Sequence, residues 1–140
     1  MEREINLGAD EIGVGIDWLL QNIVLLSKHG VSIPVTVTTA AGLVTGDLIN
    51  GARYMERLKE LLTSGNQSDI RDTIGEVVDV WAEAYKPAEG EVSEKISTQF
   101  IHLDNAKLIT GSATIPSNGM LWRAKLKDII GFCPGQLSIN

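Results

Sequence analysis

The chain has 140 residues, of which 44% are hydrophobic and 21% charged, as in an ordinary soluble globular protein. Its net charge of −6 opposes nonspecific binding to nucleic acid and to anionic membranes, and its single cysteine, Cys133, excludes an intramolecular disulfide and a multi-cysteine metal site. The amino terminus lacks the pattern of a secretory signal, and the most apolar window, 12–26, is too short and too polar to cross a bilayer. We therefore expect a single cytoplasmic domain over residues 1–140, with neither nucleic acid nor membrane as a partner.

Apolar residues recur at helical spacing near the amino terminus and predict a first helix over residues 10–29. Asp10 is placed to cap this helix, and Gly30 is placed to take the left-handed conformation just beyond its end. The apolar stripe is wide and comprises Ile12, Ile16, Leu19, Leu20, Ile23, Val24 and Leu26. We expect such a stripe to be covered on more than one side, by the mouth of a barrel or by a partner subunit.

Residues 31–50 change to a period of two and predict the first pair of strands. Pro34 has no N–H to donate to a ladder, so we expect a sheet edge at that point. Residues 40–42 form the predicted turn between the strands. Gly46 lies inside the second strand, where a glycine indicates a sharp bend or a close backbone approach.

Residues 51–95 form a predicted acidic helical insertion, because residues 56–95 carry ten acids and five bases. Apolar spacing predicts one helix over 53–63 and a second that starts at Ser68 or Asp69 and ends before the next proline. The second helix carries acidic side chains along one face: Asp72, Glu76, Asp79 and Glu83. Without a histidine or a glycine-pinned loop beside them, we interpret these carboxylates as a solvated face rather than a metal site.

Residues 96–140 return to strand-like alternation and carry two acids and four bases. The pattern predicts one strand over 100–109 and another over 120–126, joined by a long polar loop at 110–119. A final apolar segment, 129–137, completes this second strand group. The charge distribution predicts a dipolar molecule, with an acidic helical side and a weakly basic strand side.

The order of these elements predicts an α+β fold with about five strands. It resembles the Sm-like fold, through Gly42, Gly46 and Leu48 for the first Sm motif and through WRAKL at 122–126 for a degraded second motif. The resemblance implies a small, strongly bent β-barrel with an amino-terminal helix, here carrying a long two-helix insertion. It also implies a homo-oligomer, because Sm-like barrels pair their edge strands into rings.

The same comparison argues against RNA as a ligand. Where RNA-binding Sm proteins carry an Asp and an Asn, this chain has Ala52 and Glu56. The Arg of the second motif is present as Arg123, but Ala124 replaces the glycine that should follow it. A carboxylate beside a would-be phosphate path opposes the uridine-binding pocket.

A closer resemblance rests on three segments in fixed order: KHGVSIPVTVTTAAGLVTGDLI at 28–49, FIHLDNAKLITG at 100–111, and SNGMLWRAKLKDIIGF at 117–132. They are similar to the gas-vesicle accessory protein U family, over roughly residues 16–135. The resemblance implies a non-enzymatic accessory protein of gas-vesicle assembly or organisation, distinct from the shell subunit. Its implied partners are other gas-vesicle proteins, which it would contact by protein–protein interaction.

The candidate interaction residues are Trp122, Arg123, Lys125, Lys127 and Trp81. Arg123, Lys125 and Lys127 alternate on one predicted strand face. They form either a basic stripe for an acidic partner or a solvated face that protects an edge from aggregation, and the second interpretation is favoured. Trp81 continues the apolar side of the second insertion helix, so it is either a core anchor, the favoured interpretation, or part of an interface.

No residue pattern predicts a catalytic, cofactor-binding or metal-binding site. His102 has no carboxylate or nucleophile at a spacing that implies a partner, and His29 beside Gly30 complements a helix carboxyl end. Cys133 is predicted to be a small buried residue. Two alternatives stay open: a diverged Sm-like RNA-binding module that uses Arg123, and a small-ligand-binding protein or enzyme that uses the barrel mouth and His102.

Overall fold

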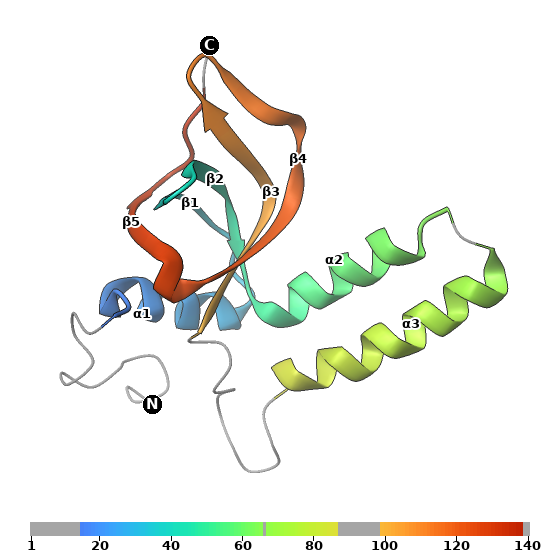
Figure 1. Cartoon of the computed structure of the whole chain (residues 1–140). Coiled ribbons are helices and arrows are strands. Elements are labelled where there is room, and N and C mark those ends of the chain that lie inside the picture. Colours follow the sequence, from blue (N-terminus) through green and yellow to red (C-terminus); the bar gives the residue numbers. More distant parts are fainter. Residues whose placement is uncertain (1–14, 66, 87–98, 139–140) are drawn as a thin grey trace.

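The structure is a computed structural model that describes residues 15–65, 67–86 and 99–138 (Figure 1). Its helices are α1 (Trp18–Leu26), α2 (Gly51–Thr63) and α3 (Ser68–Ala82). Its strands are β1 (Ile33–Thr39), β2 (Gly42–Ile49), β3 (Phe100–Thr110), β4 (Ala113–Lys125) and β5 (Ile129–Pro134). Short 3₁₀ turns η3 (Ser27–His29), η4 (Glu83–Tyr85) and η6 (Leu126–Asp128) follow α1, α3 and β4. The predicted α+β class is confirmed.

The strands form one antiparallel sheet in the order β4-β3-β2-β1-β5. Figure 1 shows that this sheet is strongly curved, with α1 beneath it and the pair α2–α3 projecting to one side. β4 and β5 lie at opposite ends of the pairing order, so the described strands do not close into the predicted barrel. The turn η6 separates these two strands in the sequence, and its Leu126 is buried in the core.

Of the two features predicted for Gly46, a sharp bend or a close backbone approach, its packing confirms the close approach. A Cβ atom at Gly46 would lie 3.1 Å from both the Ala106 Cα and the Asp104 carbonyl oxygen. The β2–β3 register also shifts between Thr45 and Asp47, around this glycine. The close approach of β3 to β2 therefore requires a residue without a side chain.

The first helix is shorter than the predicted span of 10–29. Asp17 caps α1, because its Oδ1 accepts a hydrogen bond of 2.8 Å from the Leu19 amide. The predicted cap, Asp10, lies outside the described residues. At the other end Gly30 has a φ of 84°, so its predicted left-handed role is confirmed. Leu20 and Val24 of the apolar stripe are buried in the main core, and Ile16 and Ile23 pack against it. Leu19 and Leu26 of the same stripe are about half exposed, at 49% and 46%.

The main core consists of the fully buried or nearly buried side chains Leu20, Val24, Val35, Val37, Val44, Leu48, Ile101, Leu103, Ala106 and Leu126. Trp122 packs against this cluster from β4.

The prediction of a loop over residues 110–119 is wrong. β4 begins at Ala113, and its first residues pair with β3, as in Ile109↔Thr114 and Leu108↔Ile115. Side chains in this part of β4 are mostly exposed, so no apolar alternation marks the strand, and backbone hydrogen bonds alone define it. Lys127 also differs from prediction, because it lies in η6 rather than on a strand face.

The helices α2 and α3 form an antiparallel hairpin with a small core of its own. Met55, Val78 and Tyr85 are its buried members. Asn50 fixes where α2 begins: its side-chain oxygen accepts from the Arg53 amide at 2.7 Å, and its Nδ2 donates to the Ser27 carbonyl at 3.3 Å.

Candidate functional site

The main junction between the hairpin and the sheet is built around His102. This residue lies on β3, opposite Ile49 of β2 and Arg123 of β4. Its side chain is buried, with the ring centroid 4.5 Å from that of Tyr54 and 5.4 Å from that of Tyr85. Tyr54 of α2 thus forms one aromatic wall of the junction, and Tyr85 of η4, the turn that follows α3, forms the other.

Polar contacts connect this junction to β4. The Arg123 Nε donates to the His102 Nε2 at 3.2 Å, and its Nη2 donates to the Tyr85 hydroxyl at 3.0 Å. Since Nε2 accepts from Arg123, the neutral ring carries its proton on Nδ1, and the Tyr85 hydroxyl, 3.3 Å away, also donates to Nε2. The Arg123 guanidinium in turn lies 4.0 Å from the centre of the Phe100 ring.

The charge state of His102 follows from this environment. Burial lowers the pKa of His102 to about 3, and the positive charge of Arg123 contributes the second, smaller part of this shift. The imidazole is therefore neutral near pH 7 and acts as a hydrogen-bond acceptor. The predicted alternative in which His102 serves a ligand at a barrel mouth receives no support, because its Nε2 is already bonded to Tyr85 and Arg123.

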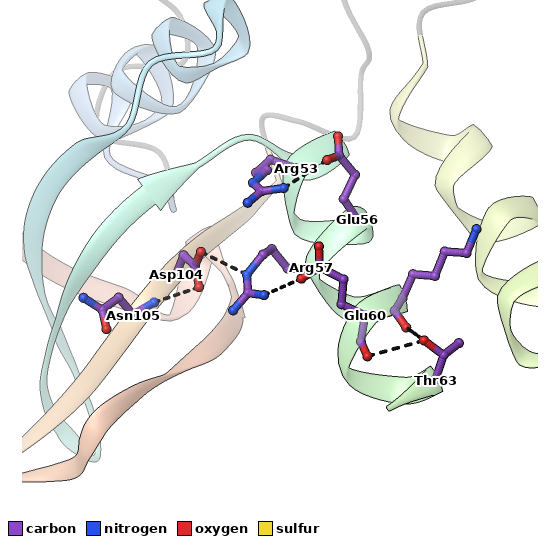
Figure 2. Close-up of polar contacts among 8 residues, drawn as sticks. Arg53, Glu56, Arg57, Glu60, Thr63, Asp104 and Asn105 are labelled. Atoms are coloured by element: carbon purple, nitrogen blue, oxygen red, sulfur yellow. Dashed lines mark hydrogen bonds and ion pairs between the residues drawn. The ribbon is translucent and has the colours of Figure 1, made fainter. Parts of the chain in front are cut away.

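A second junction holds α2 against a bulge in β3 (Figure 2). The Arg57 Nε donates to the Asp104 Oδ2 at 3.2 Å, and its Nη1 donates to Glu60 at 2.6 Å. Asp104 also accepts from the Asn105 amide at 2.9 Å. Asn105 has a φ of 55°, and Gly119 opposite it leaves the space that this conformation occupies. No sequence motif marked Arg57, and Asn105 lies in the segment FIHLDNAKLITG but had been given no role of its own.

The five predicted interaction residues do not gather at one place. Trp122 is half-buried against the main core, and Arg123 belongs to the His102 junction. Lys125 and Lys127 are exposed at the carboxyl end of β4 and in η6. Trp81 is 53% exposed on α3, so the favoured interpretation of a core anchor does not describe it.

The residues that the sequence comparison set against the RNA-binding positions, Ala52 and Glu56, lie in an acidic region. A cavity of about 420 Å³ at the start of α2 is lined by Ala52 and Glu56, together with Asp47, Asp104 and Arg53. Arg53, the cation in this lining, is paired with Glu56 at 3.0 Å, and Asp47 adds a further negative charge, so the cavity does not attract a phosphate backbone. This arrangement disfavours the RNA-binding alternative.

Two further observations complete the site. Cys133, which we predicted to be buried, is exposed, because it lies near the end of the edge strand β5. Within residues 15–65, 67–86 and 99–138, no three His, Cys, Asp or Glu side chains are grouped so that they could hold a metal ion. In the same ranges no helix has both the length and the apolar character needed to span a bilayer.

These contacts define an α+β protein with a curved antiparallel sheet and a helical hairpin anchored to one side of it. The family model described as gas vesicle protein GvpU-like matches residues 17–137, and the chain belongs to this family. The resemblance drawn from the segments at 28–49, 100–111 and 117–132 is thereby confirmed. No curated protein and no solved structure matches the chain.

Proposed function

We propose that the chain is a non-enzymatic accessory protein of gas-vesicle assembly or organisation, which acts in the cytoplasm through contacts with other gas-vesicle proteins. The observation that carries the proposal is the family match over residues 17–137. The His102 junction supports a non-catalytic role for its residues, because its polar groups are bonded to one another and its histidine is neutral.

The surface that we assign to these contacts lies at the carboxyl end of β4. Lys125 and Lys127 are exposed there, and Ile130 on the following strand is 72% exposed. Two cations beside an apolar side chain suit a partner segment that carries both acidic and apolar residues. Trp122 packs against the main core beneath this part of β4, and the exposed Arg123 is held beside it by its hydrogen bonds to His102 and Tyr85.

We also infer that the fold is a relative of the Sm-like fold. The strand order, the strong curvature and the amino-terminal helix support this inference, although the sheet is open. β4 and β5 each have one neighbour among the described strands, so each has an edge that is available for pairing with another chain. Edge pairing between copies is thus one route to the homo-oligomer expected from the sequence.

The proposed function is tested by deleting the gene in a host that forms gas vesicles and counting and imaging the vesicles. We expect altered vesicle number or arrangement, restored by the wild-type chain and only weakly by a K125E/K127E double variant. An unchanged number and arrangement after deletion would contradict the proposal. Equal expression of both complementing chains, checked by immunoblot, is the necessary control.

A further inference from the structure

The chain contains two Asn-Gly dipeptides, Asn50–Gly51 and Asn118–Gly119. In such a dipeptide the backbone nitrogen of the glycine can attack the side-chain carbonyl carbon of the asparagine, because glycine has no Cβ atom to hinder the approach. The attack requires an asparagine side chain that can turn toward the following amide, and a backbone that can adjust to it. The fold gives the two asparagines very different freedom to meet this requirement.

The side chain of Asn50 is held in place from both ends. Its Oδ1 accepts a hydrogen bond from the Arg53 amide at 2.7 Å, and its Nδ2 donates to the carbonyl of the buried Ser27 at 3.3 Å. Gly51 is fixed as well, because it is the first residue of α2 and the Tyr85 ring lies against it. Asn50 must lose both hydrogen bonds before it can react, which predicts a rate at least about tenfold below that of an unrestrained Asn-Gly dipeptide.

The side chain of Asn118 is not held in this way. It is exposed on β4, and among the described residues none makes a hydrogen bond with it. The β3–β4 register shifts here, so that residues 116–119 of β4 bulge opposite a single residue of β3, Lys107. Gly119 has a φ of 80° within this bulge. The regular ladder therefore does not fix the peptide unit that joins Asn118 to Gly119.

We propose that Asn118 is a site of spontaneous deamidation in the folded chain, and that its modification loosens the contact of α2 with β3. The Gly119 nitrogen gives its proton to the solvent and forms a bond with the Asn118 Cγ, and the side-chain nitrogen leaves as ammonia. Water then opens the resulting cyclic imide. Opening at the side-chain carbonyl leaves aspartate, whereas opening at the backbone carbonyl leaves isoaspartate, in which the main chain runs through the former side chain.

Asn118 lies beside the second junction, where Arg57 of α2 holds Asp104 of β3 (Figure 2). These three residues line one cavity of about 510 Å³. A carboxylate at residue 118 would therefore repel Asp104 and compete with it for Arg57. Isoaspartate has a further effect, because it lengthens the backbone by one carbon just before Gly119. That glycine packs closely on Asn105, where a Cβ atom at residue 119 would lie 2.9 Å from the Asn105 Cα.

Peptide mapping of the full chain tests the modification, with Asn50 as the internal control. The folded chain is incubated in mildly alkaline buffer, which favours loss of the Gly119 amide proton, and mass spectrometry follows the deamidated fraction at both dipeptides. We expect Asn118 to react at least about tenfold faster than Asn50. In urea the two sites should react at similar rates, because the fold then restrains neither. Equal rates in the folded chain, or an Asn118 that reacts only in urea, would overturn the proposal.

Hydrogen exchange tests the effect on the junction. The aged wild-type chain is compared with an N118Q chain aged in the same way, because glutamine keeps the amide group but forms a cyclic imide far more slowly. We expect the amides of α2 around Arg57 to exchange about threefold faster in the aged wild type. Fresh samples of the two chains should exchange alike, because residue 118 is exposed. An aged wild type that is deamidated at Asn118 but exchanges like N118Q would reject the loosened contact.

Discussion

The aromatic ring of Tyr85 lies directly on Gly51, where a Cβ atom at residue 51 would overlap the ring. Gly51 is the first residue of α2, and Tyr85 ends the 3₁₀ turn that follows α3. The helical hairpin therefore begins and ends at one point on the sheet. That point adjoins His102, which receives hydrogen bonds from Tyr85 and Arg123.

Replacing Gly51 with alanine tests this packing. The added methyl group would displace the Tyr85 ring and disturb its contacts with His102 and Arg123. We expect G51A to lower the free energy of unfolding by about 2 kcal/mol, the usual cost of overpacking a well-filled site. Urea denaturation followed by circular dichroism gives the value.

Gly75 provides the matched control, because it is also a buried glycine of the hairpin. A Cβ atom there would lie 3.2 Å from the Lys59 Cε, the far end of a flexible side chain that can move aside. G75A should therefore be neutral or stabilising by up to about 1 kcal/mol, as expected for Gly to Ala inside a helix. Equal losses in G51A and G75A would show that any methyl group in the hairpin is harmful and that the Tyr85 contact is not special.

The buried His102 should make stability depend on pH. The pKa of His102 is about 3 in the folded chain, against an ordinary value of 6.5. Below pH 6.5 the unfolded chain binds a proton that the folded chain does not, so this contribution to stability falls as the pH is lowered towards 3. We expect a loss of about 2 kcal/mol between pH 7 and pH 5 from this residue.

The measurement is the free energy of unfolding from urea titrations at both pH values, for the wild type and H102Q. Glutamine keeps a hydrogen-bond acceptor but does not titrate, so the difference between the two chains isolates the histidine. If H102Q loses as much stability as the wild type over this interval, the imidazole is not held neutral by burial.

Arg123 should be a stabilising residue rather than a free surface cation. R123A removes the donors to His102 and Tyr85 and the contact with the Phe100 ring. We expect a cost of about 1–2 kcal/mol in the free energy of unfolding. We expect R123K to recover less than half of this lost stability, because the ammonium group of lysine cannot reproduce the planar set of N–H donors of the guanidinium. Lys125, two residues along the same strand and exposed, is the control, and K125A should stay within about 0.5 kcal/mol of wild type.

Much of the fold was predictable where periodicity and backbone chemistry act locally. The strand pair within 31–50, the two insertion helices and the close approach at Gly46 all follow from side-chain spacing or from the absence of a side chain. The first part of β4 was not predictable, because both of its faces are largely exposed and no alternation distinguishes it from a loop. Its pairing with β3 depends on backbone hydrogen bonds, which do not require a particular pattern of side chains in the sequence.

The candidate site was less predictable, because it depends on contacts between distant segments. His102, Arg123 and Tyr85 come from β3, β4 and η4, and no motif of one segment indicates that they meet. The set of aromatic and basic interaction residues therefore combined a core-packed Trp122 with an exposed Trp81. Spacing on a strand or helix reveals which residues share a face, but not whether another part of the chain covers that face.

Flotation with intact gas vesicles tests the proposed function most directly. The purified chain is mixed with vesicles, the buoyant layer is collected, and the bound chain is measured by immunoblot. Vesicles collapsed by pressure, which sink, serve as the control for trapping. We expect the wild-type chain to rise with intact vesicles in a saturable manner and the K125E/K127E variant to rise several-fold less. A wild-type chain that stays in the lower layer at every concentration would contradict direct contact with gas-vesicle proteins.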